Sequence, residues 1–260
     1  MQEKNSLVVA FVADFRYLYK NFPRIFKELR EVGKYNGEIL IITSFLTPTF
    51  LIKEINKSNK VSVLKFKKLK FSRYAEKSLK NLNSSPNRHL LRRFQWYKLY
   101  LFHEKLKKWK YIFYLDINMN IHSDINAILN IKPENNLLAR ADGYPNYEWL
   151  LESQFDTKHP KIENLRSNFN LNLNNYFQTG LLFFDTQIIQ KNTLKQIIEI
   201  VEKYPLSITN EQGILNLYFI FINNKYEQLI QEIDERLSYY YWLLPDKEVI
   251  ISKAKSIKNK

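Results

Sequence analysis

The sequence predicts an α/β protein with one mostly parallel, mixed sheet that is flanked by helices. Near the start of the chain, apolar segments at Leu7–Ala13 and Glu38–Thr43 enclose a stretch with helical spacing, which is the order of a βαβ unit. Further on, Tyr111–Leu115 is apolar at five consecutive positions. Such a run is typical of a strand covered on both faces, as in a parallel sheet between two layers of helices. This order favours a doubly wound sheet.

The size and composition of the chain fit a single large domain. The chain has 260 residues, of which 45% are hydrophobic and 15% aromatic, enough to bury a core in one large domain or two small ones. There is no internal repeat and no linker of the kind that separates domains. We therefore expect residues 1–251 to form one domain, and the basic residues 252–260 to form a flexible tail.

The other expected elements follow from hydrophobic periodicity and from turn residues. Further strands are expected at Val61–Phe66, Leu137–Ala141 and Phe177–Asp185. Helices are expected over Pro23–Val32, Pro48–Ile55, Leu90–Lys108, Gln187–Tyr204, Ser207–Phe221 and Tyr226–Leu237. Ser84–Asn87 reads as a turn, and Glu148–Asn175 as a long loop with room for one helix.

The charge and the absence of cysteine limit the kinds of partner. A formal net charge of +14 favours polyanionic partners such as nucleic acid, an anionic membrane or phosphorylated ligands. The basic residues are spread over the chain and no nucleic-acid recognition motif accompanies them, so nucleic acid is disfavoured. Without cysteine, there can be no disulfide, thiolate metal site or cysteine nucleophile. Any metal must take oxygen or imidazole ligands.

No part of the sequence is expected to span a membrane. The longest apolar run, Ile214–Ile222, is far shorter than the ~20 residues that cross a bilayer. The apolar segment Leu7–Ala13 lacks a small-residue cleavage signature. We therefore expect a cytoplasmic protein, while delivery into a secretory compartment by a partner stays an open alternative.

Two polar side chains occupy unusual positions in these patterns. Lys98 falls within the apolar stripe of the expected helix Leu90–Lys108, where its ammonium needs an anionic partner or a route to water. Asp116 directly follows the apolar strand, and in open α/β sheets the ligand crevice lies at the carboxyl ends of the strands. The alternatives are that Lys98 snorkels to the surface, and that Asp116 and Asn118 simply form a turn.

Four segments in this order resemble the GT-A fold glycosyltransferases, especially the glycogenin-like and galactosyltransferase-like group that uses UDP-sugars. They are Trp96–Leu101, Tyr111–Met119, Phe177–Asp185 and Asn210–Asn216. Each motif is weak alone, but four in the same order are far less expected by chance. The resemblance implies a single GT-A type, Rossmann-like domain. It also implies a retaining transfer of a sugar from a nucleotide-sugar donor, expected to be a UDP-sugar, to a glycan, protein or small-molecule acceptor.

The resemblance also assigns residues to the donor. Asp116 and Asn118 match the Asp-x-Asp carboxylates that hold Mn²⁺ or Mg²⁺ against the diphosphate, and Lys98 would reach the diphosphate or the sugar. The residues expected to bind the nucleotide-sugar are Ala13, Asp14, Tyr17, Lys98, Asp116, Thr179 and Gly180. The polar residues expected around the reacting sugar, and interpreted as catalytic, are Asp142, Gln178, Glu211 and Gln212. An alternative for Glu211 and Gln212 is the first turn of a helix capped by Asn210.

Two departures from the family pattern weaken the metal site. Asn118 offers a neutral amide in place of the second carboxylate, and the last histidine of the chain is His159, so the family's late histidine ligand is missing. His122 follows Asp116 but is expected to face solvent or cap a helix. We favour a weak metal site completed by diphosphate and water, over a metal-independent transferase that relies on Lys98. A catalytically silent sugar- or nucleotide-binding protein, or a basic nucleic-acid-binding protein, are the alternative functions.

Three of the five glycines lie among the candidate residues: Gly180 and Gly213 are inside these segments, and Gly143 directly follows Asp142. A missing side chain lets a ligand approach the backbone closely. We therefore expect these positions to border a ligand.

Overall fold

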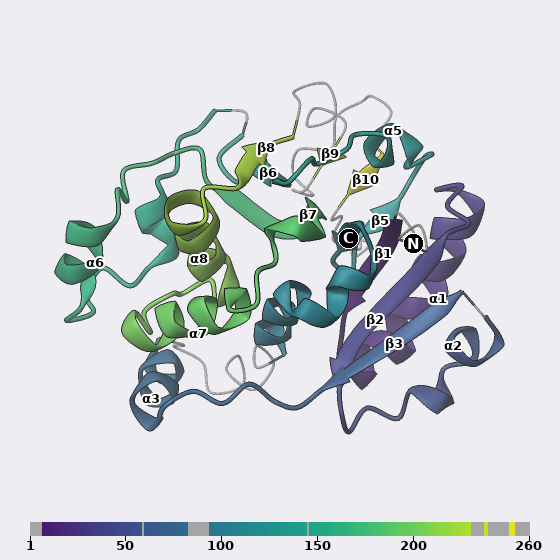
Figure 1. The fold of residues 1–260 in the computed structure, drawn as a ribbon, viewed down its shortest axis with the longest axis horizontal. Helices are drawn as coiled ribbons and strands as arrows, with labels where there is room; N and C mark the ends of the chain where they lie inside the picture. Colours follow the sequence, from purple (N-terminus) through teal and green to yellow (C-terminus); the bar gives the residue numbers. More distant parts are fainter. Residues whose placement is uncertain are drawn as a thin grey trace, which may run out of the picture.

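The fold is taken from a computed structural model, shown in Figure 1. The structure describes residues 7–58, 60–82, 94–144, 146–229, 237–238 and 250–252. The turn expected at Ser84–Asn87, the first residues of the expected helix Leu90–Lys108, and residues 253–260 of the expected tail lie outside the described residues.

The core of the fold is a seven-stranded sheet with the order β3-β2-β1-β4-β7-β6-β8. Its strands are β1 (Leu7–Val12), β2 (Glu38–Ser44), β3 (Val61–Phe66), β4 (Tyr111–Leu115), β6 (Leu137–Ala141), β7 (Phe177–Asp185) and β8 (Tyr226–Gln228). All neighbours pair in parallel except β7, which is antiparallel to both β4 and β6. The prediction of a mostly parallel mixed sheet is confirmed. A small second sheet joins β5 (Asn120–Ile121), β10 (Ile251–Ser252) and β9 (Leu237–Ser238).

The sheet separates two hydrophobic cores. Because strand side chains alternate between faces, Val9 and Phe11 pack into one core while Val8 and Ala10 pack into the other. Helix α1 (Phe15–Glu31) covers the first face with its apolar stripe. The second face is covered by α7 (Thr193–Lys203), α8 (Glu211–Asn216) and the 3₁₀ segment η2 (Gln95–Phe102). In Figure 1, α7 and α8 lie on the side of the sheet away from α1.

The aromatic side chains that a nucleic-acid-binding protein would need at its surface are largely inside these cores. Phe102, Phe113 and Phe184 are fully buried. They cannot stack on nucleobases, which removes the main support for that alternative.

Helix α1 begins earlier than the sequence predicts. It starts at Phe15 rather than at Pro23, because the Asp14 side chain accepts a hydrogen bond from the Tyr17 backbone N–H at 2.9 Å and so caps the first turn. Pro23 lies inside the helix. Asp14 therefore ends the loop after β1 and begins the helix.

The prediction of one long helix over Leu90–Lys108 is wrong. The described part forms two 3₁₀ segments, η2 and η3 (Glu104–Lys108), which are separated at His103 by extended backbone. Every side chain from Trp96 to Phe102 is buried, whereas an amphipathic α-helix would leave one face in water. The three-residue turn of a 3₁₀-helix instead places Gln95 and Lys98 on the same side.

Two further expected helices are shorter than predicted. Only Thr193–Lys203 of the segment Gln187–Tyr204 is α-helical, after a 3₁₀ turn η5 (Thr186–Ile188) whose Gln187 N–H is held by the Asp185 side chain at 2.8 Å. The helix expected from Ser207 begins at Glu211, because Ser207 is used in an isolated bridge to Phe155. It continues as a π-helical segment η6 (Leu217–Ile222).

The prediction of a helix over Tyr226–Leu237 is wrong for the described residues. Tyr226–Gln228 is strand β8 beside β6, and Leu237–Ser238 is strand β9.

The expected helix at Pro48–Ile55 is divided into η1 (Thr49–Leu51) and α2 (Lys53–Lys57). Four short helices complete the described residues: α3 (Arg73–Asn81), α5 (Asn126–Leu129), η4 (Leu151–Gln154) and α6 (Ile162–Asn168). The last two lie in the segment expected to be a long loop.

The side chain of Asn216 fixes α8 to the sheet. It is fully buried. Its Oδ1 accepts from the Phe177 N–H at 2.7 Å, and its Nδ2 donates to the Phe177 carbonyl at 2.8 Å and to the Gln212 carbonyl at 2.9 Å. This bonding sets the first residue of β7 against α8, and so holds Glu211 near Thr179.

We expect Asn216→Ala to lower the free energy of unfolding by about 3 kcal/mol, because the buried N–H and C=O of Phe177 both lose their partner. Urea unfolding followed by circular dichroism measures the change. Asn130→Ala, at an exposed position, is the control and should change stability by less than about 0.5 kcal/mol. An equal, small effect of both substitutions would contradict this role of Asn216.

Candidate functional site

Two adjoining hollows open at the carboxyl ends of β1 and β4. The walls of the first include Ala13, Asp14, Tyr17 and Asn118. The walls of the second include Gln178, Thr179, Gly180, Glu211 and Gln212. Gln95, Lys98 and Asp116 line both hollows. The structure therefore brings together eleven of the twelve residues predicted from the sequence, and Asp142 lies directly behind them.

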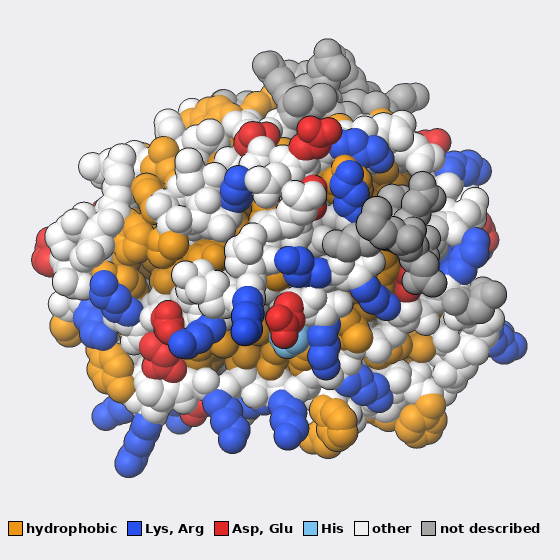
Figure 2. Space-filling model, viewed as in Figure 1, with side chains coloured by type: hydrophobic (Ala, Val, Ile, Leu, Met, Phe, Trp, Pro, Cys, Tyr) orange, Lys and Arg blue, Asp and Glu red, His pale blue; other side chains and the backbone are white. Residues whose placement is uncertain are grey.

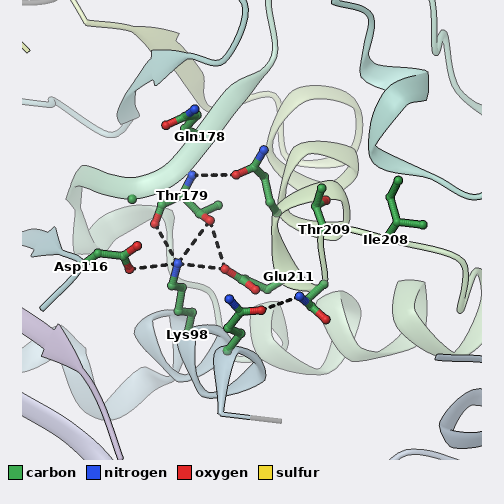
Figure 3. Close-up of a pocket in the computed structure, with 11 residues that line it drawn as sticks. Lys98, Asp116, Gln178, Thr179, Ile208, Thr209 and Glu211 are labelled. Carbon is green, nitrogen blue, oxygen red and sulfur yellow. Dashed lines mark hydrogen bonds and ion pairs between the residues drawn. The ribbon is translucent and has the colours of Figure 1, made fainter. Parts of the chain in front are cut away.

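The ammonium of Lys98 stands at the junction of the two hollows. Lys98 is 8% exposed, and its Nζ lies 3.0 Å from Asp116 Oδ1 and 2.9 Å from Glu211 Oε1. It also donates to the Thr179 carbonyl at 3.2 Å and to Thr179 Oγ1 at 3.4 Å. Figure 3 shows the side chain reaching between these groups. Lys98 is therefore paired inside the protein and does not snorkel.

The environment keeps Lys98 charged. Burial acts to lower the pKa of Lys98, but the charges of Asp116 and Glu211 and their hydrogen bonds outweigh it, so that the pKa is raised. The hydroxyl of Tyr114 donates a hydrogen bond to Asp116 Oδ1. Burial, followed by the charge of Asp116, raises the pKa of Tyr114 well above its usual value. Counted formally, one ammonium faces two carboxylates, which leaves a charge of −1 at the junction.

The antiparallel register of β7 brings these residues together. Leu115 of β4 pairs with Leu181 of β7, so the next residue, Asp116, donates its N–H to the Gly180 carbonyl at 2.8 Å. Thr179 is the residue before Gly180 on β7. Its Oγ1 donates to Glu211 Oε1 at 3.1 Å, and its N–H donates to Gln212 Oε1 at 3.3 Å.

The carboxylate of Glu211 carries an unused acceptor. Glu211 is 2% exposed, and its Oε2 is buried without a hydrogen-bond partner among the residues that the structure describes. A buried acceptor of this kind costs free energy until a donor reaches it. A hydroxyl group entering the second hollow would supply that donor.

Asp142 organises the amides behind the second hollow. One carboxylate oxygen accepts from Gln178 Nε2, and the other accepts from Gln212 Nε2 at 3.1 Å and from Gln154 Nε2 at 3.4 Å. The neighbouring Tyr176 has its pKa raised to about 12, by burial first and then by the charge of Asp142. Asp142 therefore orients the side chains of Gln178 and Gln212.

The oxygen ligands for a metal are few. No group of three acidic or histidine side chains suited to a metal ion occurs within the described ranges. Asp116 and Asn118 border the same hollow, and together they offer one carboxylate and one amide oxygen, a set that fits a hard cation only if a ligand supplies further oxygens. His122 does not join them, because its Nε2 hydrogen-bonds Ser252 Oγ at 2.7 Å.

Three site residues were missed from the sequence: Gln95, Tyr114 and Gln154. Gln95 lines both hollows and accepts a hydrogen bond from Asn210 Nδ2. Its signal was the spacing of three residues to Lys98, which places the two side chains on one side of a helix. Tyr114 precedes Asp116 by two residues, the spacing that places side chains on one face of a strand. Gln154 had no local signal.

Two of the three glycines are packed closely against the protein itself. A Cβ atom at Gly213 would meet Ser207 Oγ at 2.7 Å and the Phe155 ring at 3.0 Å, and one at Gly143 would meet the Tyr147 backbone at 3.1 Å. These positions are small because the protein packs against itself there. Gly180 lines the second hollow.

The sheet order and the paired charges at its carboxyl edge define an α/β protein with a candidate ligand site at that edge. Residues 9–251 match the model of glycosyl transferase family 8, and the chain belongs to this family. The resemblance recognised in the sequence is therefore confirmed. No curated protein sequence matches the chain.

Solved glycosyltransferases share the fold at low sequence identity. The galactosyltransferase LgtC, solved with donor and acceptor sugar analogs, gives a TM-score of 0.60 at 12% identity, over 95% of this chain and 86% of its own. The apo bifunctional glycosyltransferase WbbM gives 0.58 at 16% identity, over 100% of this chain and 47% of its own. Apo GlyE from Streptococcus pneumoniae TIGR4 gives 0.56 at 13% identity, over 97% and 55%. The chain spans about half the length of WbbM and GlyE.

We expect Lys98→Met to destabilise the protein by about 3 kcal/mol or more at pH 7, because the buried carboxylate of Glu211 and the half-buried carboxylate of Asp116 lose their shared cation. Urea unfolding at pH 7 measures the effect. Lys158→Met, at an exposed site, is the control.

The double variant Lys98→Met, Glu211→Gln sharpens this test. Removing one carboxylate together with the ammonium should recover part of the stability lost in Lys98→Met. A double variant that is less stable than Lys98→Met by the full cost of Glu211→Gln would show that the two side chains do not interact.

Proposed function

We propose that the protein is a glycosyltransferase that moves a sugar from a UDP-sugar to a hydroxyl group of a glycan, protein or small-molecule acceptor, with retention of the anomeric configuration. The observation that carries the proposal is the buried ammonium of Lys98 at the junction of the two hollows. Family membership supports transfer from a nucleotide-sugar. The choice of UDP and of retention rests on the resemblance alone.

The two hollows suggest separate binding places for two parts of the donor. The first, beside Ala13, Asp14 and Tyr17, would take the nucleoside at the carboxyl edge of the sheet. The second, beside Glu211 and Gln212, would take the sugar. The diphosphate would then lie at Lys98, whose ammonium offsets the negative charge that develops on the leaving group.

The polar groups of the second hollow suit a sugar. The unused Oε2 of Glu211 can accept a hydroxyl proton. Gln178 and Gln212, oriented by Asp142, can bind further hydroxyls with directional hydrogen bonds. A sugar ring bound in the second hollow would face the carboxylates of Glu211 and Asp142, which would favour the positive charge that forms on it.

We also propose that Mn²⁺ or Mg²⁺ accompanies the donor. The junction already carries a formal charge of −1 from Lys98, Asp116 and Glu211, so an incoming diphosphate favours a second cation. Asp116 and Asn118 would hold it through their oxygens, with the remaining ligands from diphosphate and water. When bound, the cation would supply charge stabilisation of the diphosphate. The cytoplasmic location expected from the sequence stays a prediction.

The donor is tested by thermal shift with UDP-, GDP-, CMP- and dTDP-sugars, with and without Mn²⁺, and by release of UDP from the stabilising sugar nucleotide. UDP-sugars should stabilise the protein, and a glycan acceptor should increase UDP release. Asp116→Asn should lower UDP release by about 100-fold or more. The control Asp124→Asn, at an exposed carboxylate, should keep full activity. Binding of UDP-sugar with no turnover for any acceptor would favour the silent binding protein.

The metal is tested by Asn118→Asp. A second carboxylate should tighten Mn²⁺ binding in the presence of UDP by about tenfold, as measured by isothermal titration or by the loss of the free Mn²⁺ signal in electron paramagnetic resonance. Asn130→Asp, which adds the same charge at an exposed position, is the control. Unchanged Mn²⁺ affinity in Asn118→Asp would show that Asn118 is not a metal ligand. Full activity in excess chelator would show that the reaction does not need a metal.

A further inference from the structure

The connection that follows β2 carries four large apolar side chains on the protein surface. Phe45 is 63% exposed, Leu46 86%, Phe50 70% and Leu51 54%. We call these four residues the apolar loop. Single exposed apolar residues are ordinary in folded proteins, but four large ones within seven consecutive positions concentrate exposed apolar surface on one connection, as at an interaction surface.

The base of the apolar loop is held firmly. Thr43 Oγ1 donates to the Ala13 carbonyl at 2.7 Å and lies 2.9 Å from Thr47 Oγ1. The Phe45 N–H donates to the Phe66 carbonyl at 2.8 Å, and Ile52 is buried in the core after the loop. The ends of β1 and β3 therefore hold the backbone in a position that turns the four side chains away from the core.

The surroundings of the apolar loop are strongly basic. Residues 44–72 contain seven Lys and one acidic residue, Glu54, a net formal charge of +6. Lys65 Nζ donates to the Thr47 carbonyl at 2.8 Å. The exposed Lys67 and Lys68 follow Phe66 directly, and the Lys68 ammonium pairs at the surface with Glu76 at 3.2 Å. Figure 2 shows hydrophobic side chains at the lower right edge of the molecule with Lys and Arg beside them, where Figure 1 places the connection between β2 and β3.

We propose that the apolar loop and its lysines dock the protein on the surface of an anionic lipid bilayer. The four side chains would enter the boundary between headgroups and acyl chains, while Lys67, Lys68 and their neighbours contact the lipid phosphates. Charge decides against a second copy of the chain as the occupant. A two-fold contact would set this surface against itself, and two segments of charge +6 would repel each other.

Docking in this way would orient the candidate site. The apolar loop follows β2 at the carboxyl edge of the sheet, and its base is bonded to Ala13, which lines the first hollow. The membrane would therefore lie at the same edge of the sheet as the hollows. The docking does not depend on the proposed sugar transfer, so either can be found without the other.

Co-sedimentation of the full chain with vesicles tests the proposal. Vesicles of phosphatidylcholine with phosphatidylglycerol should bind the protein, high salt should weaken the binding, and pure phosphatidylcholine should bind little. Leu46→Ser with Phe50→Ser should weaken binding at least about tenfold, because two apolar anchors are lost. Lys67→Ser with Lys68→Ser should weaken it about tenfold.

Matched controls keep the test specific. Ile222→Ser removes an apolar side chain that is 49% exposed elsewhere, and Lys27→Ser removes an exposed lysine of α1; both should bind vesicles like the parent chain. Thermal melting verifies that every variant is folded. Folded Leu46→Ser, Phe50→Ser protein that binds as tightly as the parent overturns the proposal. Failure of the parent chain to bind anionic vesicles also overturns it. Formation of a dimer by the parent chain that the Leu46→Ser, Phe50→Ser variant abolishes would overturn it as well.

Discussion

One buried ammonium, shared by two carboxylates, holds the site together. Lys98 comes from a 3₁₀ segment, Asp116 from the end of β4 and Glu211 from the start of α8, and no two of these are adjacent in the sequence. A buried charge that is left alone is costly, whereas a charge with good partners is tolerated. The three elements are therefore constrained to meet at Lys98. The two hollows lie on either side of this meeting point.

The charge at this junction bears on the proposed binding of a diphosphate. One ammonium facing two carboxylates gives a formal charge of −1, so the unliganded junction is not preset as an anion trap. Under the proposed function, a diphosphate would have to compete with Asp116 and Glu211 for Lys98, or arrive with a cation. Asn118 brings a neutral amide where a carboxylate would add negative charge, which would weaken the proposed metal site and leave Lys98 with less competition.

The carboxyl edge of the sheet carries both the hollows and the apolar loop. The hollows lie there because β1 and β4 end there, and the apolar loop lies there because it follows β2. Parallel strands thus place the candidate site and the proposed docking surface on the same side of the molecule. A glycosyltransferase arranged in this way would meet its acceptor from the membrane side.

The sequence by itself determined six of the seven strands of the main sheet, its mostly parallel class and most of the residues that line the two hollows. Apolar runs such as Tyr111–Leu115 and the polar residues that end them depend on local pattern, and motif order connected Lys98, Asp116 and Glu211 to one family. Only the tertiary structure decided the 3₁₀ form of Gln95–Phe102, the pairing of Lys98, and the amides gathered by Asp142. These depend on the antiparallel register of β7 and on burial from all sides, and contacts between residues far apart in the chain leave no periodic signal in the sequence.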